Sequence, residues 1–251
     1  MTTRTPTSPT AMAEPGAAPG TEAPDPSETA LNPGAAALLQ AWLSPGYPTG
    51  AFAYSHGLEQ AIAAGDITDT ASFETWITAL LQHGSGRSEA LLIAEAWTWP
   101  ESDAPAEHAR ALATSAERLT ETEAQGRAFA AVTVAAYTGP LGDDPALPYP
   151  VALGRAARAC GIPLAALLPL ALQAFATNLV SAAVRLVPLG QTEAQRVVQA
   201  LLPVIARVAA EAQAAAAAAS ANPLDAHGSA CFRGDIAAMR HETLHTRLFR
   251  T

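Results

Sequence analysis

Two histidines near the end of the chain have the spacing of a zinc-binding pair. Residues 241–245 read His-Glu-Thr-Leu-His. On a helix, His241 and His245 would share a face, and Glu242 could act as a general base. A catalytic zinc ion needs a third protein ligand, yet the residues after His245 include no His, Asp, Glu or Cys. We interpret the motif as accidental and keep a zinc metallohydrolase only as a competing hypothesis.

Serine, histidine and glutamate also occur together at Ser55, His56 and Glu59. These are the residue types of a hydrolytic triad, but neighbours on one short helix cannot place nucleophile, base and orienting group in line. The chain also has no phosphate-binding loop ending in Gly-Lys, since it contains no lysine. We therefore predict no catalytic residue, no cofactor, no metal site and no enzymatic activity.

The same three residues follow a rigid bend. Pro45 and Pro48 fix their own backbone angles and keep the residues before them out of the helical region, and Gly46 and Gly50 permit positive φ. Phe52, Tyr54 and Leu58 then return at mixed helical spacing. The bend is either a corner between two helices or a rigid recognition element.

The last part of the chain, residues 223–251, is predicted to be a separate tail with a helix. Within 233–251, four arginines stand against two acidic residues, and Arg233, Arg240 and Arg247 recur every seven residues, which places them on one stripe of a helix. The opposite side is apolar, with Ile236, Met239, Leu244 and Leu248. Two arrangements remain open: the tail docks on its own domain, or it becomes ordered only on a partner.

We expect helices to position both the bend and the tail, because no segment shows the alternation of apolar and polar residues that is typical of a strand. Phe73, Trp76, Ile77, Leu80 and Leu81 follow the helical core spacing. The stretch 162–184 carries no charge and could just span a membrane, but we expect a central helix that is buried all round. By contrast, the charged half of the helix expected at 115–137 is interpreted as a solvated face. The predicted fold is all-α: a single-domain helical bundle over 34–222.

Composition limits the partners and the compartment. The 251 residues carry a net charge of −9, which disfavours nucleic-acid binding, and two cysteines suit a reducing compartment. Residues 1–33 are rich in Pro, Thr, Ala and Gly and should be disordered. Without an apolar signal region there, we expect a cytoplasmic protein with no membrane contact.

Four stretches resemble the UreF family of urease accessory proteins. Residues 48–59 read Pro-Thr-Gly-Ala-Phe-Ala-Tyr-Ser-His-Gly-Leu-Glu, which is similar to the family signature. Glu-Ala-Gln-Gly-Arg at 123–127, Pro-Leu-Gly-Gln at 188–191 and the tail at 235–249 also resemble family sequence. His245 departs from the family, which commonly has Tyr there. The resemblance covers most of the chain after residue 33.

This resemblance implies a non-enzymatic, dimerising adaptor between the accessory protein UreD (also called UreH) and the GTPase UreG, which supports GTP-dependent nickel insertion into apo-urease. A generic helical binding module and a membrane-embedded helical protein are competing hypotheses. The resemblance implies that family tails contact UreD. The residues we predict to bind partners are Pro45, Pro48, Gly50, Phe52, Tyr54, Ser55, Gly57, Leu58, Glu59, Gln125, Gly126, Arg127, Pro188, Leu189, Gly190, Gln191, Arg240, His241, Glu242, Arg247, Leu248, Phe249 and Arg250.

Overall fold

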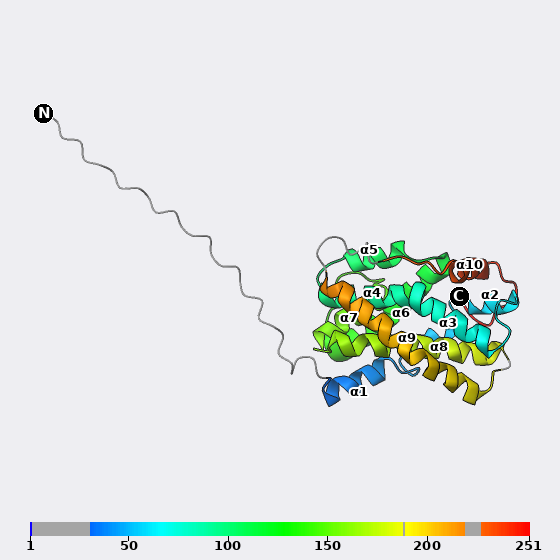
Figure 1. Ribbon diagram of the computed structural model, residues 1–251. Coiled ribbons are helices and arrows are strands. Elements are labelled where there is room, and N and C mark those ends of the chain that lie inside the picture. The colour runs from blue at the N-terminus through cyan, green and yellow to red at the C-terminus, as the bar shows by residue number, and fades with distance from the viewer. Residues whose placement is uncertain (2–30, 188, 219–226) are drawn as a thin grey trace.

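The computed structural model describes Met1 and residues 31–187, 189–218 and 227–251 (Figure 1). Most of the extension predicted to be disordered, Pro188, and the predicted boundary between domain and tail at 222 lie outside the described residues.

Every regular element in these ranges is a helix, which confirms the predicted all-α fold. The helices pack into one body, and α10 with the C-terminus lies at the same end as α2 (Figure 1). The elements are α1 (Pro33–Trp42), the 3-10 turn η2 (Ala51–Ala53), α2 (Leu58–Ala63), α3 (Thr70–His83), α4 (Ser85–Thr98), α5 (Ala104–Ala111), α6 (Ala116–Thr133), the π-helical turn η3 (Val134–Thr138), α7 (Tyr149–Ala159), α8 (Leu164–Leu186), α9 (Gln191–Ala217) and α10 (Phe232–His241).

The core forms around α3 and α4. All five residues of the predicted core face on α3 are buried, and Asp69 caps this helix by accepting a hydrogen bond from the backbone N–H of Ser72 at 2.8 Å. Helix α4 contacts α3, α5, α7, α8 and α9. Gly154 of α7 permits a close crossing, because a Cβ atom there would lie 2.6 Å from the carbonyl oxygen of Ile93. The most central helix is therefore α4.

Helix α8 differs from the prediction, because only one of its faces is buried. Leu167, Leu168 and Leu179 pack inward, toward α9, α4 and α3. Leu170 is 37% exposed, and Ser181 and Arg185 are also exposed. Since the neighbouring helices cover one side only, α8 is not enclosed all round.

By length and apolar composition, α8 and α9 could each span a membrane, but the same properties suit the core helices of a folded domain. Half of the most apolar 18-residue stretch of α8 is buried inside the protein, and for the corresponding stretch of α9 the share is 28%. The exposed side of α9 carries Arg196, Arg207 and Glu211 together with Leu202. Helix α9 is thus amphipathic. Its buried side, which includes Val197 and Leu201, faces the core.

Candidate functional site

The C-terminal tail is folded against its own domain. Helix α10 packs on α2 and also touches α6. Gly57, which precedes α2 with φ of +76°, permits this contact, because a Cβ atom there would lie 2.6 Å from the backbone nitrogen of Ala238. Of the two arrangements left open by the sequence, the structure has the first: the tail docks within the chain.

Glu59 of α2 anchors the residues that follow α10. Its carboxylate accepts hydrogen bonds from the backbone N–H of Leu248 at 2.7 Å and from that of Phe249 at 3.0 Å. The Nε2 atom of His241 lies 3.3 Å from the same carboxylate. Because Glu59 is only 7% exposed, it cannot reach a partner while the tail is docked. Its role in this structure is to hold the tail.

The last residue of the chain is also buried. The carbonyl oxygen of Thr251 accepts hydrogen bonds from the backbone N–H of Ser55, at 2.8 Å, and from the Ser55 hydroxyl. The hydroxyl of Thr251 donates to Glu121 at 2.8 Å. One residue earlier, the N–H of Arg250 donates to the carbonyl oxygen of Ala53 at 2.8 Å. The signature stretch therefore binds the C-terminus directly.

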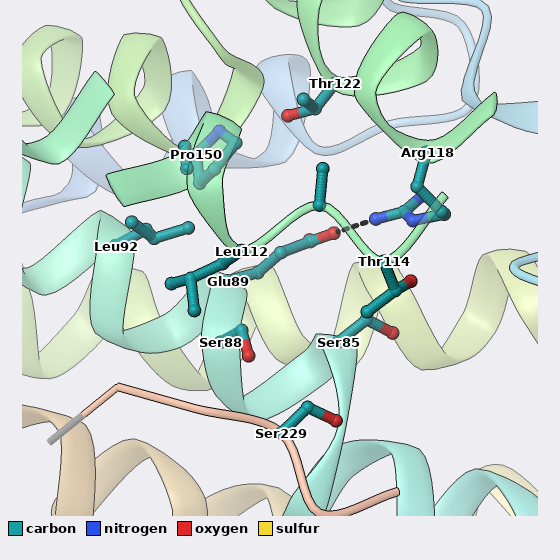
Figure 2. A pocket seen from close by; sticks show the side chains of 12 residues that line it. Ser85, Ser88, Glu89, Leu92, Leu112, Thr114, Arg118, Thr122, Pro150 and Ser229 are labelled. Carbon is teal, nitrogen blue, oxygen red and sulfur yellow. Dashed lines mark hydrogen bonds and ion pairs between the residues drawn. The ribbon is translucent and has the colours of Figure 1, made fainter. Parts of the chain in front are cut away.

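A buried charge network underlies this contact. Glu121 is 1% exposed and pairs with Arg118, and the Nε2 atom of His56 lies 3.0 Å from its carboxylate. Burial alone would raise the pKa of Glu121, but the charges and hydrogen bonds of Arg118 and His56 outweigh it and lower the pKa to about 2. Arg118 also pairs with Glu89 of α4 at 3.0 Å (Figure 2). We call Ser55, His56, Glu59, Arg118 and Glu121 the tail seat.

The tail seat corrects one sequence interpretation and adds residues that the sequence analysis missed. The charge run at the start of α6 was interpreted as a solvated face, but Arg118, Glu121 and Gln125 are all buried. Their spacing of three and four residues places them on one side of the helix, and that spacing was the available signal. Gln125 belongs to the predicted partner-binding set, and it donates to Glu121 at 2.8 Å.

The zinc-like motif does not form a metal site in this structure. Helix α10 ends at His241, so the two histidines of the motif do not share a helical face, and His245 is exposed. His241 is fully buried, and its Nδ1 atom lies 2.7 Å from Glu117 while Nε2 faces Glu59. Glu242 accepts a hydrogen bond from the backbone N–H of Ala116 at 2.8 Å, at the start of α6.

A cavity of about 70 Å³ lies beside the tail seat. Figure 2 shows the Glu89–Arg118 pair between Leu92 and Pro150 on one side and Ser85 on the other. This volume holds a few water molecules and no metabolite. This small cavity suits structural hydrogen bonding around the Glu89–Arg118 pair.

The structure divides the predicted partner-binding residues by exposure. Pro188 lies outside the described residues, and Gly50 is half-buried. Gly126 is buried where a Cβ atom would lie 1.9 Å from the carbonyl oxygen of Leu147. Tyr54, Ser55, Gly57, Leu58, Glu59, Gln125, Gly126, Leu189, His241 and Phe249 are buried. Pro45, Pro48, Phe52, Arg127, Gly190, Gln191, Arg240, Glu242, Arg247, Leu248 and Arg250 are exposed.

An apolar stripe runs along the outer face of α10. Phe232, Ile236 and Met239 are 71%, 46% and 51% exposed, and they stand at i, i+4 and i+7, on one face of the helix. We call these three residues the α10 stripe. Within the same tail and the bend that it contacts, Leu248 is 72% exposed and Phe52 61%. The α10 stripe is therefore an exposed apolar helix face, a feature that protein-binding surfaces share.

Comparisons with known proteins identify the family. The UreF family model matches residues 67–202. A urease accessory protein UreF of Cereibacter sphaeroides is 58% identical over 218 residues, which cover 86% of this chain and 99% of that protein. The proteins of that name from Roseobacter denitrificans and Rhodopseudomonas palustris are 50% and 44% identical, over 85% and 92% of this chain and 92% and 100% of their own lengths. The chain therefore belongs to the UreF family of urease accessory proteins.

Proposed function

We propose that this protein is a non-enzymatic, cytoplasmic adaptor that joins UreD (UreH) to the GTPase UreG and supports GTP-dependent nickel insertion into apo-urease. The family name supports a role in urease maturation. The observation that carries the adaptor proposal is the α10 stripe, an exposed apolar helix face on a tail that is held in place by buried polar contacts.

The α10 stripe has the pattern of a helix that docks into an apolar groove. Apolar side chains at i, i+4 and i+7 are the usual anchors of such helices. Arg240, in the last turn of α10, and Arg250, near the end of the tail, are exposed. Neither forms an ion pair within the described part of the chain. They can therefore pair with acidic groups of UreD. Phe249, which is among the residues predicted from the sequence to bind a partner, is buried beside Arg185.

The preformed tail favours binding, because a partner does not need to order it. Glu59, Ser55 and Glu121 fix the backbone that follows α10. A segment that is already ordered loses less conformational entropy when it binds. The tail seat thus supports the adaptor role indirectly, by presenting the α10 stripe in one conformation.

We also propose that the chain forms a homodimer. The exposed face of α8 supports this, because Leu170 is 37% exposed and Gln173 and Thr177 follow it at i+3 and i+7, with Arg185 near the end of the helix as the one charged residue of α8. A partly apolar face with a single charge can be covered by a second copy at little desolvation cost. Light scattering of the purified protein tests the oligomeric state. A mass of two chains supports the proposal, and a mass of one chain contradicts it.

Co-purification tests the adaptor role. The full-length chain, UreD and UreG are combined pairwise and all together, with and without GTP and nickel, and urease activation is assayed with the same samples. We expect UreG to be retained on UreD only when this chain is present. Retention of UreG on UreD without this chain, or no binding of this chain to UreD, would overturn the proposal.

A further inference from the structure

A second and larger cavity, of about 690 Å³, lies where α5, the segment between η3 and α7, and the end of α7 meet. Its volume is in the range of sites that hold a small molecule or a short piece of a partner chain. None of the residues that line it belongs to the tail seat, to the α10 stripe or to the partner-binding set predicted from the sequence. The proposed adaptor role therefore leaves this cavity unexplained.

Arg110 of α5 fixes one wall of the cavity. Its guanidinium binds Glu123 of α6 at 2.9 Å and also pairs with Asp144, in the segment that leads to α7. Burial alone would raise the pKa of Asp144, but the hydrogen bonds from Arg110 and from the backbone N–H of Ala146 outweigh it and lower the pKa. Arg110 is thus matched by two carboxylates of its own chain and has no charge left for a ligand.

Arg155 of α7 lines the same cavity without such a match. Its side chain is 4% exposed, and it donates to the carbonyl oxygens of Leu141, at 2.7 Å, and of Ser102. The carboxylate paired with it is that of Asp103, 3.5 Å away, on a side chain that is 87% exposed. The Nε atom of Arg155 makes no hydrogen bond within the described residues. Buried donors are almost always paired, so Arg155 calls for a further oxygen acceptor.

Unpaired carboxylates surround the cavity on the solvent side. Glu101, Glu107 and Asp143 line it, are exposed, and form no ion pair within the part of the chain that the structure describes. We call these three residues the acidic rim. Arg158, which also lines the cavity, instead lies over the ring of Trp97, 4.6 Å from its centroid. Carboxylates outnumber arginines in the lining by two, so the cavity carries an excess of negative charge.

We propose that this cavity binds a short basic segment of a partner protein. Arginine or lysine side chains of the segment pair with the acidic rim, and one of its backbone carbonyl oxygens accepts a hydrogen bond from Arg155. A peptide carries both groups close together, whereas a small anion is repelled by the rim and a small cation offers no acceptor to Arg155. Opposite charge on the two partners also speeds their encounter.

The cavity is suited to binding before a partner arrives, because Arg110 and Arg155 already tie its walls together. A preformed site loses less conformational entropy when it binds. No described residue of the tail lines the cavity, so both surfaces can be occupied at once. This inference does not depend on binding to UreD or UreG, and it is tested on the isolated chain.

The test is an NMR titration of the full-length protein with the acetylated and amidated peptide Gly-Arg-Gly-Arg-Gly. At about 0.15 M salt, charges more than about 8 Å away are largely screened. We expect saturable shifts at the acidic rim and at the Nε–H resonance of Arg155. Glu107→Gln and Asp143→Asn should each weaken binding about 2- to 5-fold. The variant that also carries Glu101→Gln should lose about 10-fold or more.

The matched control is Glu211→Gln, which removes one exposed carboxylate on α9 and should bind the peptide as the wild type does. All three rim residues are exposed, so their variants should keep the native circular dichroism. Absence of saturable binding, an equal loss in the control, or an unmoved Nε–H resonance of Arg155 would overturn the proposal. Equal binding of a peptide with glutamine in place of arginine, or of free arginine, would also overturn it.

Discussion

Gly57 and Ala238 lie in contact, backbone to backbone, where α10 crosses the start of α2. A Cβ atom on Gly57 would lie 2.6 Å from the nitrogen of Ala238 and 2.9 Å from the carbonyl carbon of Ala237. Backbone atoms on a packed helix cannot yield as the end of a long side chain can. The glycine of the signature stretch is thus the position that permits the tail helix to dock.

Gly57→Ala should displace α10 from the domain. Gly65→Ala is the matched control, because Gly65 has the same kind of positive φ, +79°, with no atom within 4 Å of an added Cβ. The control should lose about 1–2 kcal/mol in the free energy of unfolding from backbone strain alone. In urea denaturation, Gly57→Ala should lose clearly more free energy of unfolding than the control does. Its tail should also be the first segment cut in limited proteolysis. Equal losses in the two variants would show that the contact does not constrain the tail.

Glu59→Gln should loosen the tail at its anchor. A glutamine oxygen can still accept one of the two backbone hydrogen bonds, but its NH₂ group would face the other donor. We expect a loss of about 1–3 kcal/mol in the free energy of unfolding. Glu211→Gln, on the exposed side of α9, is the control and should change little. Faster hydrogen exchange at Leu248 and Phe249 would support the assignment, and unchanged exchange there would contradict it.

The stability of the protein should fall at acid pH partly because of Glu121. Its pKa is lowered from 4.5 to about 2 by Arg118 and His56, against the effect of burial. A lowered folded-state pKa adds stability that is present above the unfolded value and is lost as the pH falls through the folded value. In Glu121→Gln, the slope of unfolding free energy against pH between about 4.5 and 2 should therefore be shallower than in the wild type. An identical slope would contradict the lowered pKa.

The sequence predicted the fold where the local pattern carried the information. The core face of α3 followed from helical spacing, since all five of its residues lie within nine positions. The single buried face of α8 could not be predicted in this way, because an uncharged helix gives no indication of which neighbours are absent. Likewise, Arg118 and Glu121 look like surface residues until His56 and Thr251 are known to lie beside them.

The tail seat could not be predicted from the sequence, because its contacts join residues from distant parts of the chain. Glu59 and Phe249 are 190 residues apart, and the sequence placed both in a partner-binding set without indicating that they bind each other. For the same reason, removal of residues 234–251 should destabilise the body, whereas the sequence alone predicts that the body stays folded without them. It would leave the buried carboxylates of Glu59 and Glu121 without tail donors. Point substitutions on the exposed face are therefore the sharper probes of binding.

The most direct test of the proposed adaptor role is the affinity for UreD of a variant with a charged α10 stripe. Ile236→Glu and Met239→Glu alter exposed side chains on α10 and should leave the fold intact. Leu202→Glu is the control, at a residue of similar exposure on α9. Burying an unpaired carboxylate costs several kcal/mol, so we predict that each α10 variant loses at least about 100-fold in affinity while Leu202→Glu binds as the wild type does. Unchanged UreD affinity in both α10 variants, with native circular dichroism, would contradict the account.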